Sequence, residues 1–318
     1  MALPIKPILG ILADNLSRRG SVLPLSKSTS TRWAKGLDLP RGGETVIYTG
    51  HMYQLIPAID AMSAQMAMFE NSPITRFFGL GRFMNRFVNL SFFMALMASG
   101  KQRREYDQML ASIATLLQRA GVSFGYLYGE ELYSGTLIYD EGLDDIFAKH
   151  ARRVHEMFKK NGVKRIITVD PHTTNMMREV YPKFIEDFDI EVLNYLEILA
   201  EKDFTPSLKT DGAEHVIHDS CVYARYEGMI DQPRQLLKNA GVKLLEPELH
   251  GKATHCCGGP IEALFPSEAH RIAEIRVAQL RERGDNIVTM CPICLVNLRK
   301  AAGDKAMVND ISTILSAP

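Results

Sequence analysis

Apolar and polar positions along the chain follow two periods, and these predict strands and helices in turn. Short runs of β-branched and aromatic residues predict strands at 45–50, 123–129, 163–169 and 285–290. Apolar residues recurring every three or four positions predict helices over 8–17, 52–69, 101–119, 143–162 and 267–284. Ser267 suits the N-cap of the last helix and Gly284 its end. Strands that alternate with helices indicate parallel α/β layers.

The order of strand, turn and helix occurs twice. RIITVDPHTTNMM (165–177) aligns with NIVTMCPICLVNL (286–298), and LYSGTLI (132–138) aligns with HCCGGPI (255–261). An internal duplication therefore predicts two open parallel α/β subdomains related by pseudo-symmetry, over residues 46–204 and 205–318. Ligands of such sheets bind beyond the carboxyl ends of the strands, where both cysteine-bearing turns of the second half fall.

Charge and hydropathy exclude some partner classes. Lys plus Arg equals Asp plus Glu, at 37 each, so no basic field favours nucleic acid. The N-terminus lacks the features of a signal peptide, and the apolar stretch 87–100 is too short to span a membrane. We therefore expect a cytoplasmic protein. Thiols stay reduced there and more often bind metal than form disulfides.

All five cysteines lie in the second half: Cys221, Cys256, Cys257, Cys291 and Cys294. The last two sit at a strand-to-helix turn, where amides and the helix dipole favour anionic sulfur. The glycines after the CC pair let the backbone pass close to a bulky group. Zinc and a cubane cluster each take four ligands, so five thiolates suit a larger iron–sulfur core. By counting alone, zinc plus a spare thiol stays open.

The spacing C…CCG…CPxC resembles the signature of the CCG (cysteine-rich) domain, over residues of about 10 to 305. This domain occurs in the B subunit of heterodisulfide reductase and in heterodisulfide reductase-like complexes. The resemblance implies one non-cubane [4Fe-4S] cluster per chain, with each of the five cysteines matching a ligand of the family. It also implies that a disulfide is cleaved at that cluster.

The first copy departs from this pattern, so its motif is degenerate. Its five matching positions are His51, Tyr133, Ser134, Asp170 and Thr173. Because no soft thiolate remains, we expect this half to be free of a cluster. A site for a harder metal on the His, Tyr and Asp side chains is the alternative.

Three further side chains are candidates. His255 and His218 lie near ligand cysteines, and either could protonate a leaving thiolate, because imidazole titrates near neutral pH. A structural histidine that donates to a cluster sulfur is the alternative. Arg225, one helical turn after Cys221, could bind a substrate carboxylate or phosphate, or else form a surface ion pair.

Two segments stand outside the duplication. Residues 14–45 resemble the linker that follows a ferredoxin-type domain in fused relatives, and we expect the N-terminal extension 1–45 to dock on a partner. A helical insertion over about 58–118 includes the apolar stretch 87–100. Arg76, Arg82 and Arg86 precede that stretch within the insertion. A partner surface is favoured for it over a membrane-surface helix or a buried helix.

The resemblance implies an iron–sulfur redox subunit that reduces a disulfide or oxidises a thiol in sulfur metabolism. The resemblance implies three partners: a ferredoxin-type iron–sulfur subunit, a second CCG subunit and a flavoprotein subunit. Membrane contact is expected only through partners. The alternatives are a non-catalytic electron relay or assembly subunit and a zinc-stapled scaffold.

Overall fold

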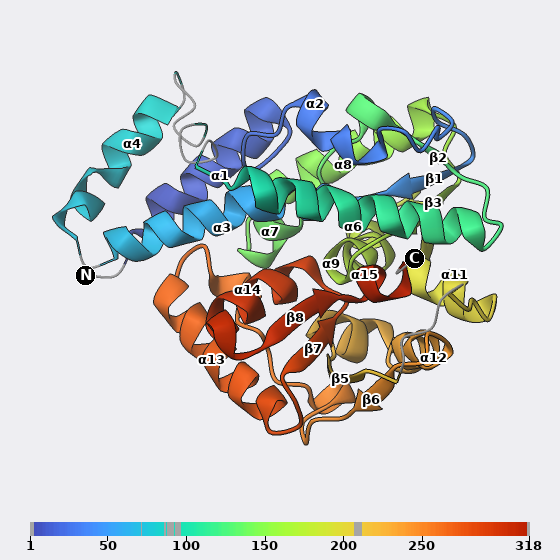
Figure 1. Ribbon diagram of the computed structural model, residues 1–318. Helices are drawn as coiled ribbons and strands as arrows, with labels where there is room; N and C mark the ends of the chain where they lie inside the picture. Colours follow the sequence, from blue (N-terminus) through green and yellow to red (C-terminus); the bar gives the residue numbers. More distant parts are fainter. Residues whose placement is uncertain are drawn as a thin grey trace.

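The computed structural model describes residues 3–70, 72–85, 87, 92, 97–206 and 212–316. Two four-stranded sheets lie one after the other along the chain, and helices cover both of them (Figure 1). Most of the apolar stretch 87–100 and the side chains of Arg76 and Arg86 lie outside the described residues. No helix within the described ranges has both the length and the apolarity needed to cross a bilayer.

The two sheets have the same topology. Their strand orders are β2-β1-β3-β4 and β6-β5-β7-β8, and every pairing is parallel. This confirms the predicted α/β class and the duplication. The strands are β1 (Thr45–Tyr48), β2 (Gly125–Tyr126), β3 (Arg165–Thr168), β4 (Glu191–Asn194), β5 (Glu214–His218), β6 (Lys243–Leu245), β7 (Asn286–Thr289) and β8 (Met307–Asp310).

The middle residues of the central strands are apolar on both faces of each sheet. Val46 and Ile47 of β1 and Ile287 and Val288 of β7 are fully buried. Such runs are expected where helices cover both faces of a parallel sheet. At the edge, β2 is shorter than predicted. Beyond it the chain turns into a 3₁₀ segment, Tyr128–Glu130.

Helices fill the connections between strands and flank both sheets. Their bounds are α1 (Ile5–Arg19), α2 (Lys27–Ser30), α3 (Met52–Phe69), α4 (Phe78–Asn85), α6 (Gly100–Arg119), α7 (Thr136–Asp140), α8 (Asp144–Lys160), α9 (Pro171–Asn175), α10 (Tyr181–Phe184), α11 (Tyr195–Glu201), α12 (Asp231–Asn239), α13 (Pro266–Arg281), α14 (Pro292–Ala302) and α15 (Ile311–Leu315). Single π-helical turns occupy Met176–Val180 and Tyr223–Glu227.

The predicted cap of α13 is wrong. The helix begins at Pro266, which has no amide hydrogen that would need a cap, and its N-cap position is Phe265. The hydroxyl of Ser267 instead donates to the carboxylate of Glu70, at the end of α3. The helix also ends at Arg281, before Gly284.

The carboxyl edges of the two sheets face each other. The hydroxyl of Tyr53, just after β1, donates to Asp310 at the end of β8, with 3.1 Å between the oxygens. In the mirrored place, Asn194 at the end of β4 donates to the hydroxyl of Tyr223, just after β5, at 2.7 Å. Side chains that follow the strands of one repeat therefore reach the other repeat.

Candidate metal centre

Five cysteines meet at the carboxyl edge of the second sheet. Cys221 follows β5, and Cys256 and Cys257 precede the short 3₁₀ segment Gly259–Ile261. Cys291 is the N-cap residue of α14, and Cys294 lies in the first turn of that helix. Three separate turns thus bring the thiols together, as the sequence predicted from their positions after strands.

The thiols form one continuous row. Hydrogen bonds link Cys221 to Cys256, Cys256 to Cys257, Cys257 to Cys294 and Cys294 to Cys291. The last three thiols are buried, whereas Cys221 and Cys256 are partly open. Soft sulfur donors gathered in a largely closed place fit an iron–sulfur cluster, which uses cysteine thiolates as its protein ligands.

Two of the thiols are favoured as thiolates, the form that binds metal. Hydrogen bonds from Cys221 and Cys257 hold the pKa of Cys256 far below its ordinary value, and the amide of Gly258 helps, at 3.3 Å from the sulfur. Burial raises the pKa of Cys291, but hydrogen bonds with Cys294 and His172 outweigh burial and leave this pKa well below its ordinary value.

The paired glycines let the CC loop lie against two helices. Gly258 has a φ of +81°, and a Cβ there would stand 2.4 Å from the carbonyl oxygen of Ala269 in α13. A Cβ on Gly259 would stand 2.2 Å from Cγ2 of Ile293 in α14. The loop therefore needs glycine for close packing as well as for its backbone conformation.

The first repeat contributes a histidine to this site. His172 of α9 is hydrogen-bonded to Cys291, and its Nδ1 lies 3.8 Å from a carboxylate oxygen of Asp140. Burial opposes the charged imidazole, yet the hydrogen bond and the negative charges of both partners raise the pKa of His172 to about 9. The sequence reasoning missed this residue, because His172 aligns with Ile293 and with no ligand cysteine.

The buried Arg276 donates hydrogen bonds to two side chains of the site. The Nε of Arg276 donates to Nδ1 of His218 at 3.1 Å, and its NH2 group donates to the hydroxyl of Thr254 at 3.3 Å. Burial lowers the pKa of Arg276 to about 10, so the guanidinium stays charged at neutral pH. A sequence signal existed, since Arg276 falls within the buried stripe of α13 that includes Ala273 and Val277.

This contact decides the tautomer of His218. A guanidinium can only donate, so Nδ1 of His218 must accept and the neutral ring carries its proton on Nε2. Burial lowers the pKa of His218 to about 3, so the ring is neutral. A ring nitrogen lies within 4.8 Å of the sulfurs of Cys257 and Cys294, but no nitrogen has a free lone pair. In this arrangement His218 faces the sulfurs as a hydrogen-bond donor.

A cavity of about 680 Å³ opens beside the partly open end of the row. Cys221 and Arg225 line it from the second repeat, and His172 and Lys183 line it from the first. This volume lies within the range of small-molecule sites, about 300–1,000 Å³. The cavity thus joins Cys221, basic side chains from both repeats, the carboxyl groups of Asp140 and Glu179, and solvent.

The other predicted side chains have clear places. Arg225 donates to the carbonyl oxygens of Lys252 and Thr254, at 3.1 and 2.5 Å, and so holds the loop that leads to Cys256. His255 is half-buried, and its Nδ1 lies 3.0 Å from the carbonyl oxygen of Cys256. His255 does not line the cavity.

The matching positions of the first repeat are closely packed. A Cβ on Gly50 would stand 2.4 Å from the hydroxyl oxygen of Thr173 and 3.1 Å from Cβ of Ser134. Asp170 caps α9 by accepting from the amide of Thr173 at 2.9 Å. His51 is buried, and burial lowers its pKa to about 3. Small side chains thus stand close together where the second repeat gathers its sulfurs, and the absence of a cluster here stays a prediction.

A comparison with known protein families matches the second repeat, which carries the five cysteines. Residues 215–299 match the family model CCG, the cysteine-rich domain. This match confirms the resemblance seen in the sequence, and it covers the strands and turns that bring the five thiols together.

Three curated proteins illustrate the similarity. The "Probable iron-sulfur-binding oxidoreductase FadF" of Bacillus subtilis is 32% identical over 68% of this chain and 32% of its own length. The "EtfAB:quinone oxidoreductase" of Syntrophomonas wolfei is 34% identical over 65% of this chain and 30% of its own. One subunit of the dihydromethanophenazine:CoB–CoM heterodisulfide reductase of Methanosarcina mazei is 29% identical over 61% of this chain and 50% of its own. The chain thus spans about a third to a half of these relatives.

Proposed function

Residues 215–299 of this chain are a cysteine-rich domain of the CCG family, and from this premise we propose that the chain is an iron–sulfur redox subunit of a heterodisulfide reductase-like complex. Its cofactor would be one non-cubane [4Fe-4S] cluster held by Cys221, the Cys256–Cys257 pair, Cys291 and Cys294. The substrate would be a disulfide or a thiol of sulfur metabolism. A cytoplasmic location accords with this role.

One observation carries the proposal. The row of five thiols ends at Cys221, and this residue also lines the large cavity between the repeats. A cluster that only relayed electrons would need no cavity at a ligand cysteine. The cavity therefore favours substrate chemistry over the relay. Lys183 could bind a carboxylate or phosphate of the substrate, and the cavity is also lined by Asp140 and Glu179.

The overall reaction balances when partner subunits supply or accept the electrons. A disulfide takes up two electrons and two protons and yields two thiols, and thiol oxidation is the reverse. When bound, an iron–sulfur cluster supplies one-electron transfer. The chain's own residues would keep the sulfurs of Cys257, Cys291 and Cys294 buried, hold the CC loop through Arg225 and orient the substrate in the cavity.

Partners follow from this balance. One intact site per chain handles one electron at a time, so a second CCG subunit would complete the two-electron reaction. A ferredoxin-type iron–sulfur subunit and a flavoprotein subunit would deliver or remove the electrons. The names of the relatives accord with such an assembly, since one is a subunit and another acts with EtfAB.

The test begins with anaerobically purified protein. We expect iron and sulfide near about four each per chain, and a cluster EPR signal that changes when a thiol or disulfide is added under oxidising conditions. A colourless protein with one zinc would overturn the proposal. A cluster whose spectrum responds to no thiol or disulfide would leave the electron relay instead.

A further inference from the structure

Polar side chains of helix α4 attach it to α1, and Phe78 at its start packs against Phe69 of α3. Nε of Arg82 lies 3.3 Å from a carboxylate oxygen of Asp14 in α1. The side-chain amide nitrogen of Asn85 donates to Oδ1 of Asn15 at 2.9 Å. Arg19 donates to the backbone oxygen of Asn85, also at 2.9 Å. Asn85 is the buried residue of this helix.

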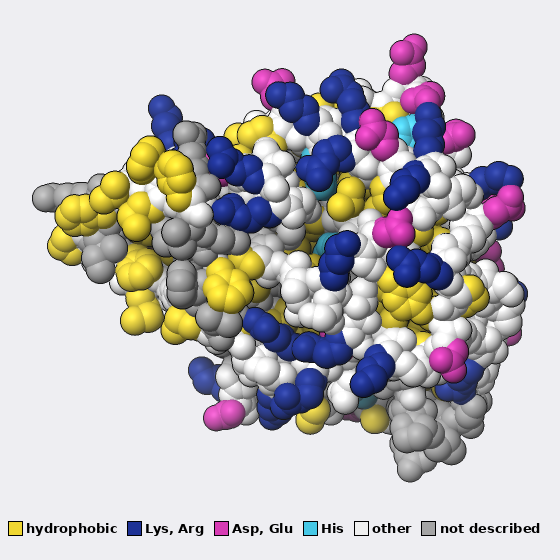
Figure 2. All heavy atoms as spheres, turned by 90° about the horizontal axis from the view of Figure 1, so that it is seen from above, with side chains coloured by type: hydrophobic (Ala, Val, Ile, Leu, Met, Phe, Trp, Pro, Cys, Tyr) yellow, Lys and Arg dark blue, Asp and Glu magenta, His cyan; other side chains and the backbone are white. Residues whose placement is uncertain are grey.

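Large apolar side chains around α4 point to solvent instead. They form what we call the apolar patch: Met68, Phe77, Leu80, Phe83, Met84, Phe87, Phe92 and Met97. Phe77 is 66% exposed and Phe87 is 76% exposed. In Figure 2 hydrophobic side chains gather at the end of the molecule where α4 lies. A surface helix normally buries its apolar stripe, so this reversed orientation indicates an apolar environment outside the chain.

The charge around the patch has one sign. Between residues 71 and 104 the sequence has no Asp or Glu and six basic residues: Arg76, Arg82, Arg86, Lys101, Arg103 and Arg104. Lys101 and Arg104 at the start of α6 are exposed. The acids that flank this segment are engaged, Glu70 with Ser267 and Glu105 with Arg299, and Asp14 of α1 pairs with Arg82.

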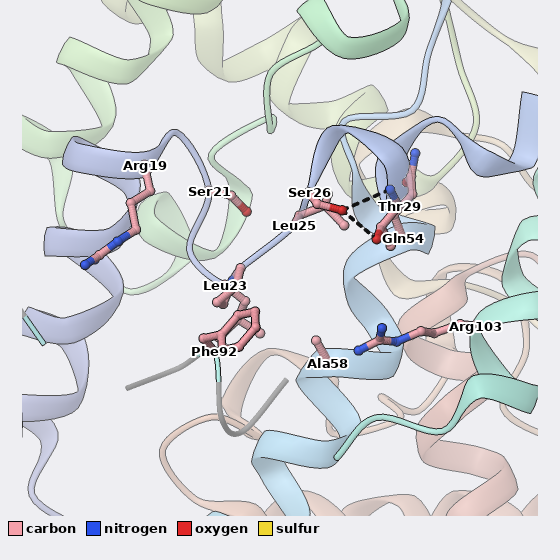
Figure 3. A pocket seen from close by; sticks show the side chains of 11 residues that line it. Arg19, Ser21, Leu23, Leu25, Ser26, Thr29, Gln54, Ala58, Phe92 and Arg103 are labelled. Atoms are coloured by element: carbon pink, nitrogen blue, oxygen red, sulfur yellow. Dashed lines mark hydrogen bonds between the residues drawn. The ribbon is translucent and has the colours of Figure 1, made fainter. Parts of the chain in front are cut away.

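A cavity adjoins the patch through Phe92. It has a volume of about 340 Å³ and lies between α1, α2 and α3 (Figure 3). Leu23, Leu25 and Phe92 make its lining partly apolar, and Arg103 adds a cation. The buried carbonyl oxygen of the Gln54 side chain, also in the lining, accepts no hydrogen bond from a described residue. Apolar and cationic groups thus stand together beside the exposed phenylalanines.

We propose that the apolar patch binds the surface of a bilayer that contains anionic phospholipids. Exposed phenylalanines next to arginines and lysines are typical of segments that lie in the membrane interface. Anionic headgroups attract such cations, by an amount that falls with added salt. This inference does not depend on the redox role proposed above.

The test is flotation of the full chain with vesicles. We expect binding to vesicles of phosphatidylcholine with about a quarter phosphatidylglycerol, and at least about tenfold weaker binding to phosphatidylcholine alone or in high salt. Phe83→Ser with Phe87→Ser, and separately Lys101→Glu with Arg104→Glu, should each weaken binding by about tenfold. Matched controls are Met307→Ser, which is exposed on β8, and Lys238→Glu, which is exposed on α12.

Each outcome decides the proposal. Controls that bind like the wild type, with both test pairs weakened, support it. Failure to float with either vesicle would overturn the proposal. A partner protein would then be the expected occupant of the apolar patch. Binding that the two test pairs leave unchanged would overturn it as well.

A second observation, the contact of Arg276 with His218, carries an independent inference that rests on the proposed function. We infer that His218 donates its Nε2 hydrogen to a sulfur of the bound cluster and that Arg276 holds it in this tautomer. Nε2 of His218 is buried and makes no hydrogen bond with a described residue, and the ring lies beside Cys257 and Cys294. Hydrogen bonds to cluster sulfurs stabilise the reduced, more negative state.

The readout is the midpoint potential, followed by EPR in protein whose iron and sulfide match the wild type. His218→Phe should lower the ratio of reduced to oxidised cluster at a fixed potential by about tenfold, which is about 59 mV for one electron. His218→Gln keeps a donor and should restore part of this shift, whereas Arg276→Lys should lower the potential because it loses the directed Nε donor. Arg299→Lys is the control, because the side chain of Arg299, on the same helix α14 as Cys294, bonds Glu105 and the carbonyl oxygen of Val308 and contacts neither His218 nor Arg276 by a described hydrogen bond.

The outcomes separate this inference from the proposed function. Unchanged potentials in both His218→Phe and Arg276→Lys would overturn the inference while the redox role stands. Loss of iron from both variants would also overturn it, since these residues would then hold the ligands in place. A wild-type chain without a cluster would instead refute the redox role.

Discussion

The hydroxyl of Tyr53 donates to the carboxylate of Asp310 across the interface between the two repeats, at 3.1 Å. Tyr53 stands two residues after His51, and Tyr223 stands two residues after Cys221, where it accepts from Asn194. The duplication is therefore visible in single hydrogen bonds as well as in the strand order. These paired tyrosines help to keep the carboxyl edges of the two sheets facing each other.

Tyr53→Phe should weaken this interface. The variant keeps the ring but leaves one oxygen of buried Asp310 without its donor, so we expect the free energy of unfolding to fall by about 1–2 kcal/mol. Urea denaturation would measure it. Tyr226→Phe, at a tyrosine that is 69% exposed, is the control and should change little. Equal stability of both variants would show that the interface does not depend on this hydrogen bond.

The proposed ligand set can be tested by exchanging matched positions of the two repeats. Cys257→Ala should lose iron, sulfide and activity together, because it removes a buried sulfur from the middle of the row. Ser134→Ala, at the aligned position of the first repeat, should keep the metal content of the wild type. His51→Ala should keep it too. Iron lost from a first-repeat variant would revive a metal site there.

The CC loop should depend on the space at Gly258. In Gly258→Ala the new Cβ would meet the carbonyl oxygen of Ala269 at 2.4 Å, in a backbone conformation that also disfavours alanine. Gly228→Ala is the matched control, since Gly228 has a φ of +67° and open space around it. We expect the control to cost about 1–2 kcal/mol and Gly258→Ala to cost about 1–3 kcal/mol more, with loss of iron.

Stability should depend on pH through Glu131, whose carboxylate accepts from the amide and hydroxyl of Thr49. Burial raises the pKa of Glu131 from 4.5 to about 8, although both hydrogen bonds oppose this. The folded chain holds the proton more tightly than the unfolded chain does. The stabilisation is therefore complete below the ordinary pKa and is lost as pH rises through the raised one.

The measurement compares wild type with Glu131→Gln, so that other titrating groups cancel. Between these two pKa values, the free energy of unfolding of the wild type should fall relative to the variant by up to about 1.4 kcal/mol per pH unit. Parallel pH profiles for the two proteins would mean that Glu131 titrates normally.

Much of the second repeat could be predicted because its signals are local. A strand followed by Cys-Pro and a helix places Cys291 and Cys294 at one turn, whatever surrounds them. The alignment of LYSGTLI with HCCGGPI was equally informative, since Gly135 and Gly258 have nearly the same φ, +85° and +81°. Ser267 shows the limit of local reasoning, because Pro266 had already met the need that a cap would serve.

The amino-acid sequence by itself determined the α/β class, the duplication and the five cysteines, because strand periodicity, turn residues and ligand spacing are written in neighbouring positions. Only the tertiary structure decided that His172 reaches Cys291, that Arg276 directs His218 and that α4 turns its apolar side outward. These contacts join residues from different elements and repeats. Burial, tautomer and orientation depend on what packs against a side chain, and no run of adjacent residues encodes that.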